Sequence, residues 1–99
     1  MKKILFALIS VIAVNTHAEN FYSGNDFMAK SEGIQVTYVV GVVDGFLATN
    51  EVPFCLPKDV TTGQLAAISK KYLTDNPEKR HFTAASNIAV ALGKAFPCK

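Results

Sequence analysis

The chain has 99 residues, of which 49% are hydrophobic and 18% are charged, and its formal net charge is +2 at pH 7. This length fits one small domain. The weak positive charge, with no stretch that interleaves aromatic and basic residues, excludes the usual pattern of a nucleic-acid-binding protein.

The N-terminus is expected to be a secretory signal peptide, residues 1–18. Two lysines precede an apolar run over residues 4–14, and small residues lead up to Ala18, as a signal peptidase requires. The run has 11 residues, whereas a membrane-spanning helix needs about 20. No cysteine follows it to carry a lipid anchor. Cleavage after Ala18 would give a periplasmic chain of residues 19–99, with 8 basic and 8 acidic residues and no formal net charge.

Export to an oxidising compartment predicts that the two cysteines, Cys55 and Cys98, form a disulfide. The bridge would close a loop of 44 residues, which stabilises a fold by about 4 kcal/mol in the chain-entropy model. This matters in a domain with a small core. A zinc site would have only these cysteines and His81 as ligands, without the closely spaced pair that zinc sites use. Neither a metal nor another cofactor is expected.

The first part of the mature chain predicts a short helix and then an ambiguous segment. Ser23–Asp26 is typical of a turn, and a helix is expected from Asp26 to about Ser31, broken by Glu32–Gly33. Residues 34–47, IQVTYVVGVVDGFL, begin with the alternation of a strand. As a helix they would be apolar nearly all round, as in a central or interface helix. One face of that helix would consist of Ile34, Tyr38, Gly41, Val42, Gly45 and Phe46.

The second half predicts two helices. After a turn at Leu56–Asp59, Thr61 and Gln64 form a capping box. The helix that follows is expected to end at Asn76–Pro77, with a short turn through Arg80. Its inward residues are Leu65, Ile68, Tyr72 and Leu73, and its outward residues are Ser69, Lys70 and Lys71.

Thr83 is expected to cap the last helix, which Pro97 ends. The apolar stripe of that helix consists of Ala85, Ile88, Ala89, Leu92 and Phe96. Two clear helices without a hairpin signal favour an all-α fold, a small bundle of four to five helices.

Few residues suggest chemistry. Gly41 and Gly45 are expected to let another helix approach closely. Asp44 lies within an apolar run, so it is expected to be a structural carboxylate that either has a partner, with Arg80, His81 or backbone amides as candidates, or reaches solvent. His81 is expected to bond a helix end. No nucleophile elbow, metal-spaced pair or phosphate loop is present, so the chain is not expected to be an enzyme.

Several segments together resemble the Rap/Tai family, whose characterised members are immunity proteins that neutralise type VI secretion amidase effectors in the periplasm. They are TYVVGVVDGF (37–46), FCLPKDVTTGQL (54–65), KKYLTDNPEKRHFTAAS (70–86) and ALGKAFPCK (91–99). The resemblance implies an all-helical fold, with residues 34–47 as helix, and a Cys55–Cys98 bridge. It also implies a homodimer. Ser31 and Gln35 stand where many members carry a second cysteine pair, so a looser N-terminal helix is expected.

The resemblance implies that the chain binds an amidase effector and occludes its active site without chemistry of its own. Exposed loops suit this role. The candidate partner-binding loop is residues 75–81, with Asp75, Asn76, Glu78, Lys79, Arg80 and His81, and Asn50–Pro53 is a second candidate. The alternative function is a small periplasmic chaperone or stress protein, which the apolar segment 34–47 could serve if it were uncovered.

Overall fold

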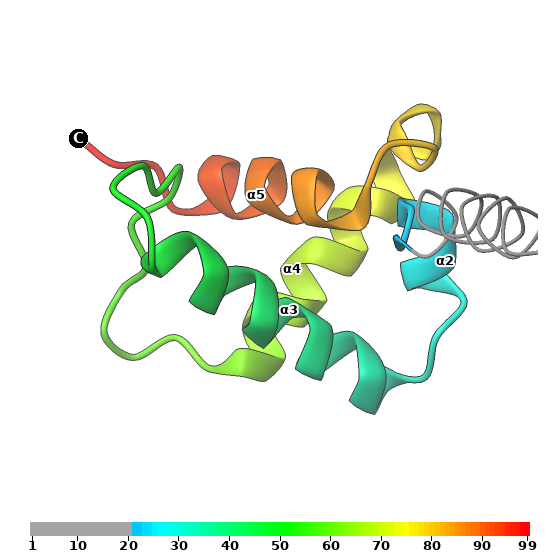
Figure 1. The fold of residues 1–99 in the computed structure, drawn as a ribbon, viewed down its shortest axis with the longest axis horizontal. Helices are drawn as coiled ribbons and strands as arrows, with labels where there is room; N and C mark the ends of the chain where they lie inside the picture. The colour runs from blue at the N-terminus through cyan, green and yellow to red at the C-terminus, as the bar shows by residue number, and fades with distance from the viewer. Residues whose placement is uncertain (1–20) are drawn as a thin grey trace, which may run out of the picture.

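The computed structural model describes residues 21–99, and the predicted signal peptide with its cleavage site after Ala18 lies outside them. These residues form four α-helices, one 3-10 helix and no strand longer than a single bridge (Figure 1). The all-α prediction is confirmed. The elements are α2 (Gly24–Met28), α3 (Glu32–Leu47), α4 (Thr62–Asp75), η2 (Pro77–Lys79) and α5 (Ala84–Ala95).

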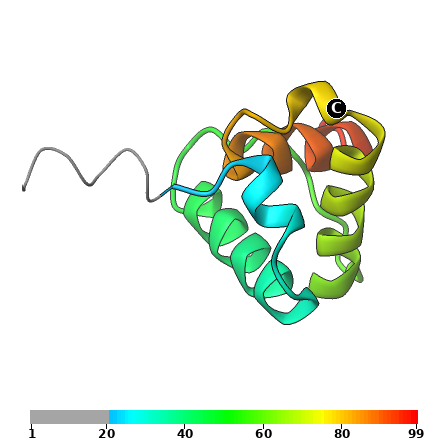
Figure 2. The same ribbon diagram turned by 90° about the vertical axis from the view of Figure 1, so that its right-hand side faces the viewer.

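The three long helices surround one apolar core. α4 packs against both α3 and α5, and α2 packs against α4 and α5. Figure 2 shows α3, α4 and α5 as the sides of a triangle, with α2 across one end. Fully buried side chains from every α-helix meet inside it, including Phe27, Val39, Leu73, Ile88 and Leu92.

α2 begins two residues earlier than predicted because Ser23, not a later residue, is its N-cap. The Asp26 amide donates to Ser23 Oγ at 3.1 Å, and the Ser23 amide donates to Asp26 Oδ2 at 3.0 Å. The hydrogen bond from the Ser23 amide is the main cause of the lowered pKa of Asp26, and the hydrogen bond with the Ser23 hydroxyl lowers that pKa further. Glu32 and Gly33 open α3 instead of breaking a helix, so that prediction was wrong.

α3 is a helix, as the resemblance implied, and the face described from its sequence contacts the core only through Tyr38, Val42 and Phe46, which are half-buried. The buried residues of α3 are Gln35, Val39 and Val43, whereas Ile34 is 47% exposed. Gly41 and Gly45 face outward, and a Cβ built on either meets nothing within 4 Å among the described residues. The expected close approach of another helix is therefore absent from this part of the chain. A helix that is apolar nearly all round gives no pattern from which its orientation can be read.

Gln35 connects α2 to α3 without a disulfide. Its side chain is 4% exposed, and its Nε2 donates to the Phe27 carbonyl at 3.0 Å. The backbone of α2 is also hydrogen-bonded to the segment before α5. The Gly24 amide donates to the Phe82 carbonyl at 2.9 Å, and the Asn25 amide donates to the Arg80 carbonyl at 3.0 Å. Position 35 thus ties the N-terminal helix to the bundle by a hydrogen bond in place of a covalent link.

The caps predicted for α4 and α5 are confirmed. The Gln64 amide donates to Thr61 Oγ1 at 3.1 Å, and the Ser86 amide donates to Thr83 Oγ1 at 3.2 Å. Ser69 was wrongly expected to face out. It is 1% exposed because its hydroxyl donates to the Leu65 carbonyl at 2.9 Å and needs no water.

The buried face of α5 differs in part from the predicted stripe. Ile88 and Leu92 are buried as expected, while Ala85 and Ala89 are only half-buried. The remaining buried positions are Ala84, Asn87 and Ala91. Alanine and asparagine at these positions give too weak an apolar contrast to locate the face from the sequence.

The predicted disulfide between Cys55 and Cys98 is present, with the two Cα atoms 5.1 Å apart. The Cys55 amide also donates to the Phe96 carbonyl at 2.9 Å. Two glycines allow the backbone contacts on either side of the bundle. A Cβ on Gly24 would lie 2.9 Å from Arg80 Cα, and a Cβ on Gly93 would lie 2.8 Å from Pro53 O.

Candidate partner-binding site

The segment from Asp75 to Thr83 connects α4 to α5 and stands out at one end of the bundle (Figure 1). α4 ends because Asn76 leaves the helical region, with φ −129° and ψ 67°, directly before Pro77. η2 then makes one tight turn. The residues of this segment include all six that the sequence suggested for partner binding.

Two of the six are used inside the molecule. Arg80 is half-buried, and its Nε donates to the Leu73 carbonyl at 2.7 Å while Nη2 donates to the Thr74 carbonyl at 3.3 Å. Asn76 Nδ2 donates to the Tyr72 carbonyl at 2.8 Å. These side chains satisfy the last carbonyls of α4, which have no partner within the helix. Arg80 and Asn76 therefore hold the segment in place.

The other four predicted residues are exposed. Asp75 accepts from Lys71 Nζ at 2.8 Å, a surface ion pair that raises the pKa of Lys71. Glu78, Lys79 and His81 have no salt bridge within the described residues. His81 was expected to bond a helix end, but its ring lies beside Phe82 instead, with the centroids 4.1 Å apart. Three side chains remain free for a partner.

Asn87 of α5 fixes the other side of the segment. It is 4% exposed, and its Nδ2 donates to the carbonyls of Lys79 and Thr83, both at 3.0 Å. Together with the bonds from α2, these bonds hold residues 75–83, which we call the exposed turn, in one conformation. The role of Asn87 was not predicted, although the sequence shows it as a polar residue directly before Ile88, within the expected apolar stripe.

The second candidate loop, Asn50–Pro53, is not part of this site. Its end is joined to the C-terminal end of α5 through the Cys55–Cys98 bridge, whereas residues 75–83 lead into the N-terminal end of α5. α5 has 12 residues, so the two loops are separated by about 18 Å of helix. One compact partner surface does not include both loops.

A groove of about 330 Å³ lies beside the exposed turn, between α4, η2 and α5. We call it the Phe82 groove. Phe82 is 50% exposed and Val90 is 43% exposed. Its complete lining combines two lysines with aromatic, aliphatic and small polar residues: Tyr72, Lys79, Phe82, Ser86, Asn87, Val90 and Lys94. The sequence prediction missed it because its walls come from three separate elements.

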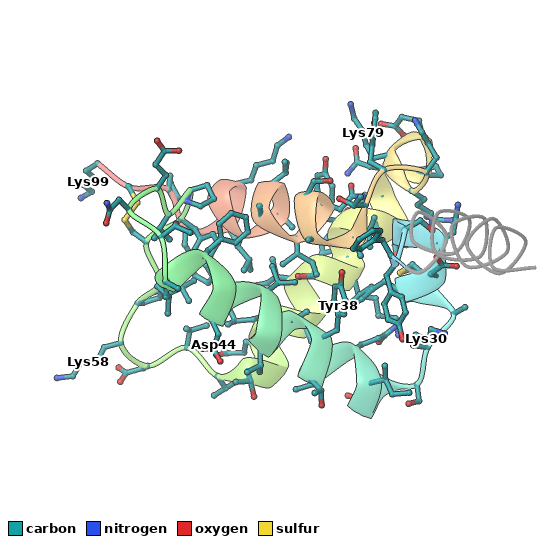
Figure 3. The ribbon with its side chains drawn as sticks, viewed as in Figure 1. Lys30, Tyr38, Asp44, Lys58, Lys79 and Lys99 are labelled. Atoms are coloured by element: carbon teal, nitrogen blue, oxygen red, sulfur yellow. A yellow bond between two sulfur atoms is a disulfide. The ribbon has the colours of Figure 1, made fainter. Side chains whose placement is uncertain are left out.

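The outer face of α3 is a second exposed surface, on another side of the triangle. It is formed by Ile34, Thr37, Gly41, Gly45 and Ala48, all exposed and uncharged. Asp44 beside them is exposed too (Figure 3), so of the two arrangements expected for it the carboxylate reaches solvent. A carboxylate in water requires no compensating charge.

Residues 21–99 contain no group of three or more His, Cys, Asp or Glu side chains that could hold a metal ion. Burial, and then the neighbouring Tyr22, raises the pKa of Tyr38, whose ring stacks on that of Tyr22 at 5.0 Å. In the same part of the chain, no helix has the length and apolar character needed to cross a membrane.

Comparison with known proteins gives one match. The model of a family described as Rap1a immunity proteins matches residues 19–98. No curated protein and no solved structure matches the chain. The family match covers the whole bundle, including the exposed turn and both cysteines, and the chain therefore belongs to the Rap1a immunity protein family.

Proposed function

We propose that this protein is a periplasmic immunity protein that binds a type VI secretion peptidoglycan amidase and occludes its active site. Family membership supports the immunity role. The main support for active-site occlusion is the exposed turn. Glu78, Lys79 and His81 project from a backbone that Arg80 and Asn87 hold from both sides.

A fixed turn is suited to tight inhibition. A segment that is already ordered loses little conformational entropy on binding, so more of the contact energy appears as affinity. The turn is also short, because only residues 76–83 lie between the end of α4 and the start of α5. Such a shape fits a concave active site better than the flat side of a helix does. No catalytic group is needed for this role.

Two observations support the periplasm as the place of action. The family match begins at residue 19, directly after the predicted cleavage site. The Cys55–Cys98 disulfide is of the kind that persists in oxidising compartments. Both agree with the basic and apolar N-terminus of the sequence, which is typical of a signal peptide.

The test uses the exported, disulfide-bonded protein as bait for secreted and periplasmic hydrolases under non-reducing conditions. We expect a captured amidase to lose its peptidoglycan hydrolysis when the protein is added in a saturating amount. The double variant Glu78→Ala/His81→Ala should weaken this inhibition, while Thr62→Glu, exposed at the start of α4, should not. Unchanged hydrolysis at saturation would contradict the proposal. Broad suppression of client aggregation, without inhibition, would favour the chaperone alternative.

We also propose that a second copy covers the outer face of α3. Two glycines one turn apart allow a close approach of helices, and α3 carries only Glu32 and Asp44 as charged residues in 16 positions. Ile34 beside them leaves apolar area exposed that a partner copy would bury.

Light scattering on the purified protein tests the dimer. The wild type should have twice the monomer mass. Gly41→Glu should have the monomer mass, because it places a charge in the contact while its Cβ meets nothing within 4 Å among residues 21–99. Thr62→Glu adds the same charge elsewhere and should remain dimeric. A wild type of monomer mass, or a dimeric Gly41→Glu variant, would show that α3 is not the interface.

A further inference from the structure

The charges of this formally neutral mature chain are segregated along the sequence. Residues 21–59 carry five acidic and two basic side chains, and residues 60–99 carry two acidic and six basic ones. No Asp or Glu occurs from Lys79 to Lys99. α2, α3 and the loop after them are therefore acidic, while α4, η2 and α5 are basic. The Phe82 groove lies entirely within the basic half.

The two lysines of the groove have no carboxylate partner among the described residues. The only salt bridge within residues 21–99 joins Lys71 to Asp75, and neither of these residues lines the groove. Lys79 Nζ lies 5.9 Å from the centroid of the Phe82 ring, and Lys94 Nζ lies 5.8 Å from that of Tyr72. Aromatic faces position both ammonium groups without neutralising them.

The distance between the two lysines limits how far apart the two carboxylates of a ligand can be. Asn87 binds the Lys79 carbonyl, so Lys79 lies near position 87 of α5, two helical turns before Lys94. This corresponds to roughly 10 Å along the helix. Side chains of an extended chain alternate between two faces, so two carboxylates that both face the groove at a comparable spacing are four residues apart, about 13 Å, which the flexible lysine side chains can reach. Phe82 and Val90, both partly exposed, lie between the lysines and offer an apolar surface to the residues between those carboxylates.

We propose that the Phe82 groove binds an extended acidic segment of the partner enzyme, with two carboxylates on Lys79 and Lys94 and apolar side chains between them. This inference rests on the proposed function, because it assigns the groove to the same partner that the exposed turn engages. Two lysines around an apolar centre fit a peptide better than nucleic acid, which requires many phosphate contacts. The groove adds charge selectivity and faster association to the shape recognition by the turn.

The test titrates the purified, disulfide-bonded protein with acetyl-Glu-Leu-Leu-Leu-Glu-amide, whose two carboxylates face the same side when the peptide is extended, and follows backbone amides by NMR. The amides of Phe82, Val90 and Lys94 should shift, and the affinity should exceed that for acetyl-Gln-Leu-Leu-Leu-Gln-amide by about ten-fold. The double variant Lys79→Glu/Lys94→Glu should lose this preference. The matched variant Lys58→Glu/Lys99→Glu should retain it, because neither lysine lines the groove. Figure 3 shows both at the end of the molecule away from Lys79.

Equal affinity for the two peptides would overturn the inference. So would shifts centred on Lys58 and Lys99, or a preference that survives in Lys79→Glu/Lys94→Glu. The titration contains no enzyme, so its failure leaves the inhibition assay to decide the proposed function. Conversely, an amidase that is not inhibited contradicts the proposed function while the charge preference of the groove is still measured. All variants are at exposed positions, and their melting temperatures should match that of the wild type.

Discussion

The double variant Cys55→Ser/Cys98→Ser should be less stable than the wild type by about 4 kcal/mol. The bridge spans a sequence separation of 43 residues and therefore removes much conformational freedom from the unfolded chain. In a domain of this size that loss corresponds to a melting temperature roughly 15–30 °C lower. Thermal unfolding followed by circular dichroism, with and without reductant, measures it.

The reductant serves as the control for the serine substitutions. Reduced wild-type protein and the double variant should melt at the same temperature, because both lack only the cross-link. A variant that melts like the oxidised wild type would show that the bridge contributes nothing to stability. A variant far less stable than the reduced protein would show that the serines themselves disturb the packing around Phe54, which is 2% exposed.

The variant Gly24→Ala should be destabilised by about 1–3 kcal/mol, the usual result of forcing extra volume into a packed site. Its new Cβ would lie 2.9 Å from both Arg80 Cα and Leu73 Cδ2, and 3.0 Å from Arg80 O. Two of these atoms belong to the backbone and cannot move independently. The displacement would also strain the bond from the Gly24 amide to Phe82 O.

Gly33→Ala is the matched control for this substitution. Gly33 lies in the first turn of α3 as Gly24 lies in the first turn of α2, but its Cβ meets nothing within 4 Å. Alanine there should leave stability unchanged or raise it by up to about 1 kcal/mol, because glycine is a poor helix former. Urea unfolding of both variants gives the comparison. Equal stabilities would show that α2 does not approach Arg80 closely.

Most local chemistry was predictable from the sequence, and tertiary contacts were not. The capping box and the end of α4 and the N-cap of α5 depend on residues at most three positions apart, and Thr61, Gln64, Asn76 and Thr83 were placed correctly. The capping box of α2, Ser23 with Asp26, is equally local and was missed. The disulfide followed from the compartment and from there being only two cysteines. The orientation of α3 could not be derived, because apolar residues surround that helix almost evenly.

The glycines also show that tertiary contacts could not be predicted from the sequence. Gly41 and Gly45 stood out in the sequence through their spacing, yet they face outward in the described chain. Gly24 and Gly93 had no such signal, and their importance comes from Arg80 and Pro53, which are distant in sequence. Spacing along one helix does not identify the segment that packs against it.

The candidate site was located in part. The loop from residue 75 to 81 is exposed as expected, but the role of Arg80 was not foreseen, since it depends on where the last carbonyls of α4 point. The Phe82 groove requires Tyr72, Lys79 and Lys94 to come together from three elements. Such a site follows from the packing angles of the helices, which a single sequence does not specify.

The position of the disulfide has a consequence for how the protein ages. The Cys55–Cys98 bridge closes one end of α5, while the exposed turn and its supports from Arg80, Asn87 and α2 lie at the other. Oxidative or reductive damage to the bridge would first open the chain to proteases at the C-terminal end. The exposed turn at the opposite end is held only by non-covalent contacts, so the bridge does not constrain it directly.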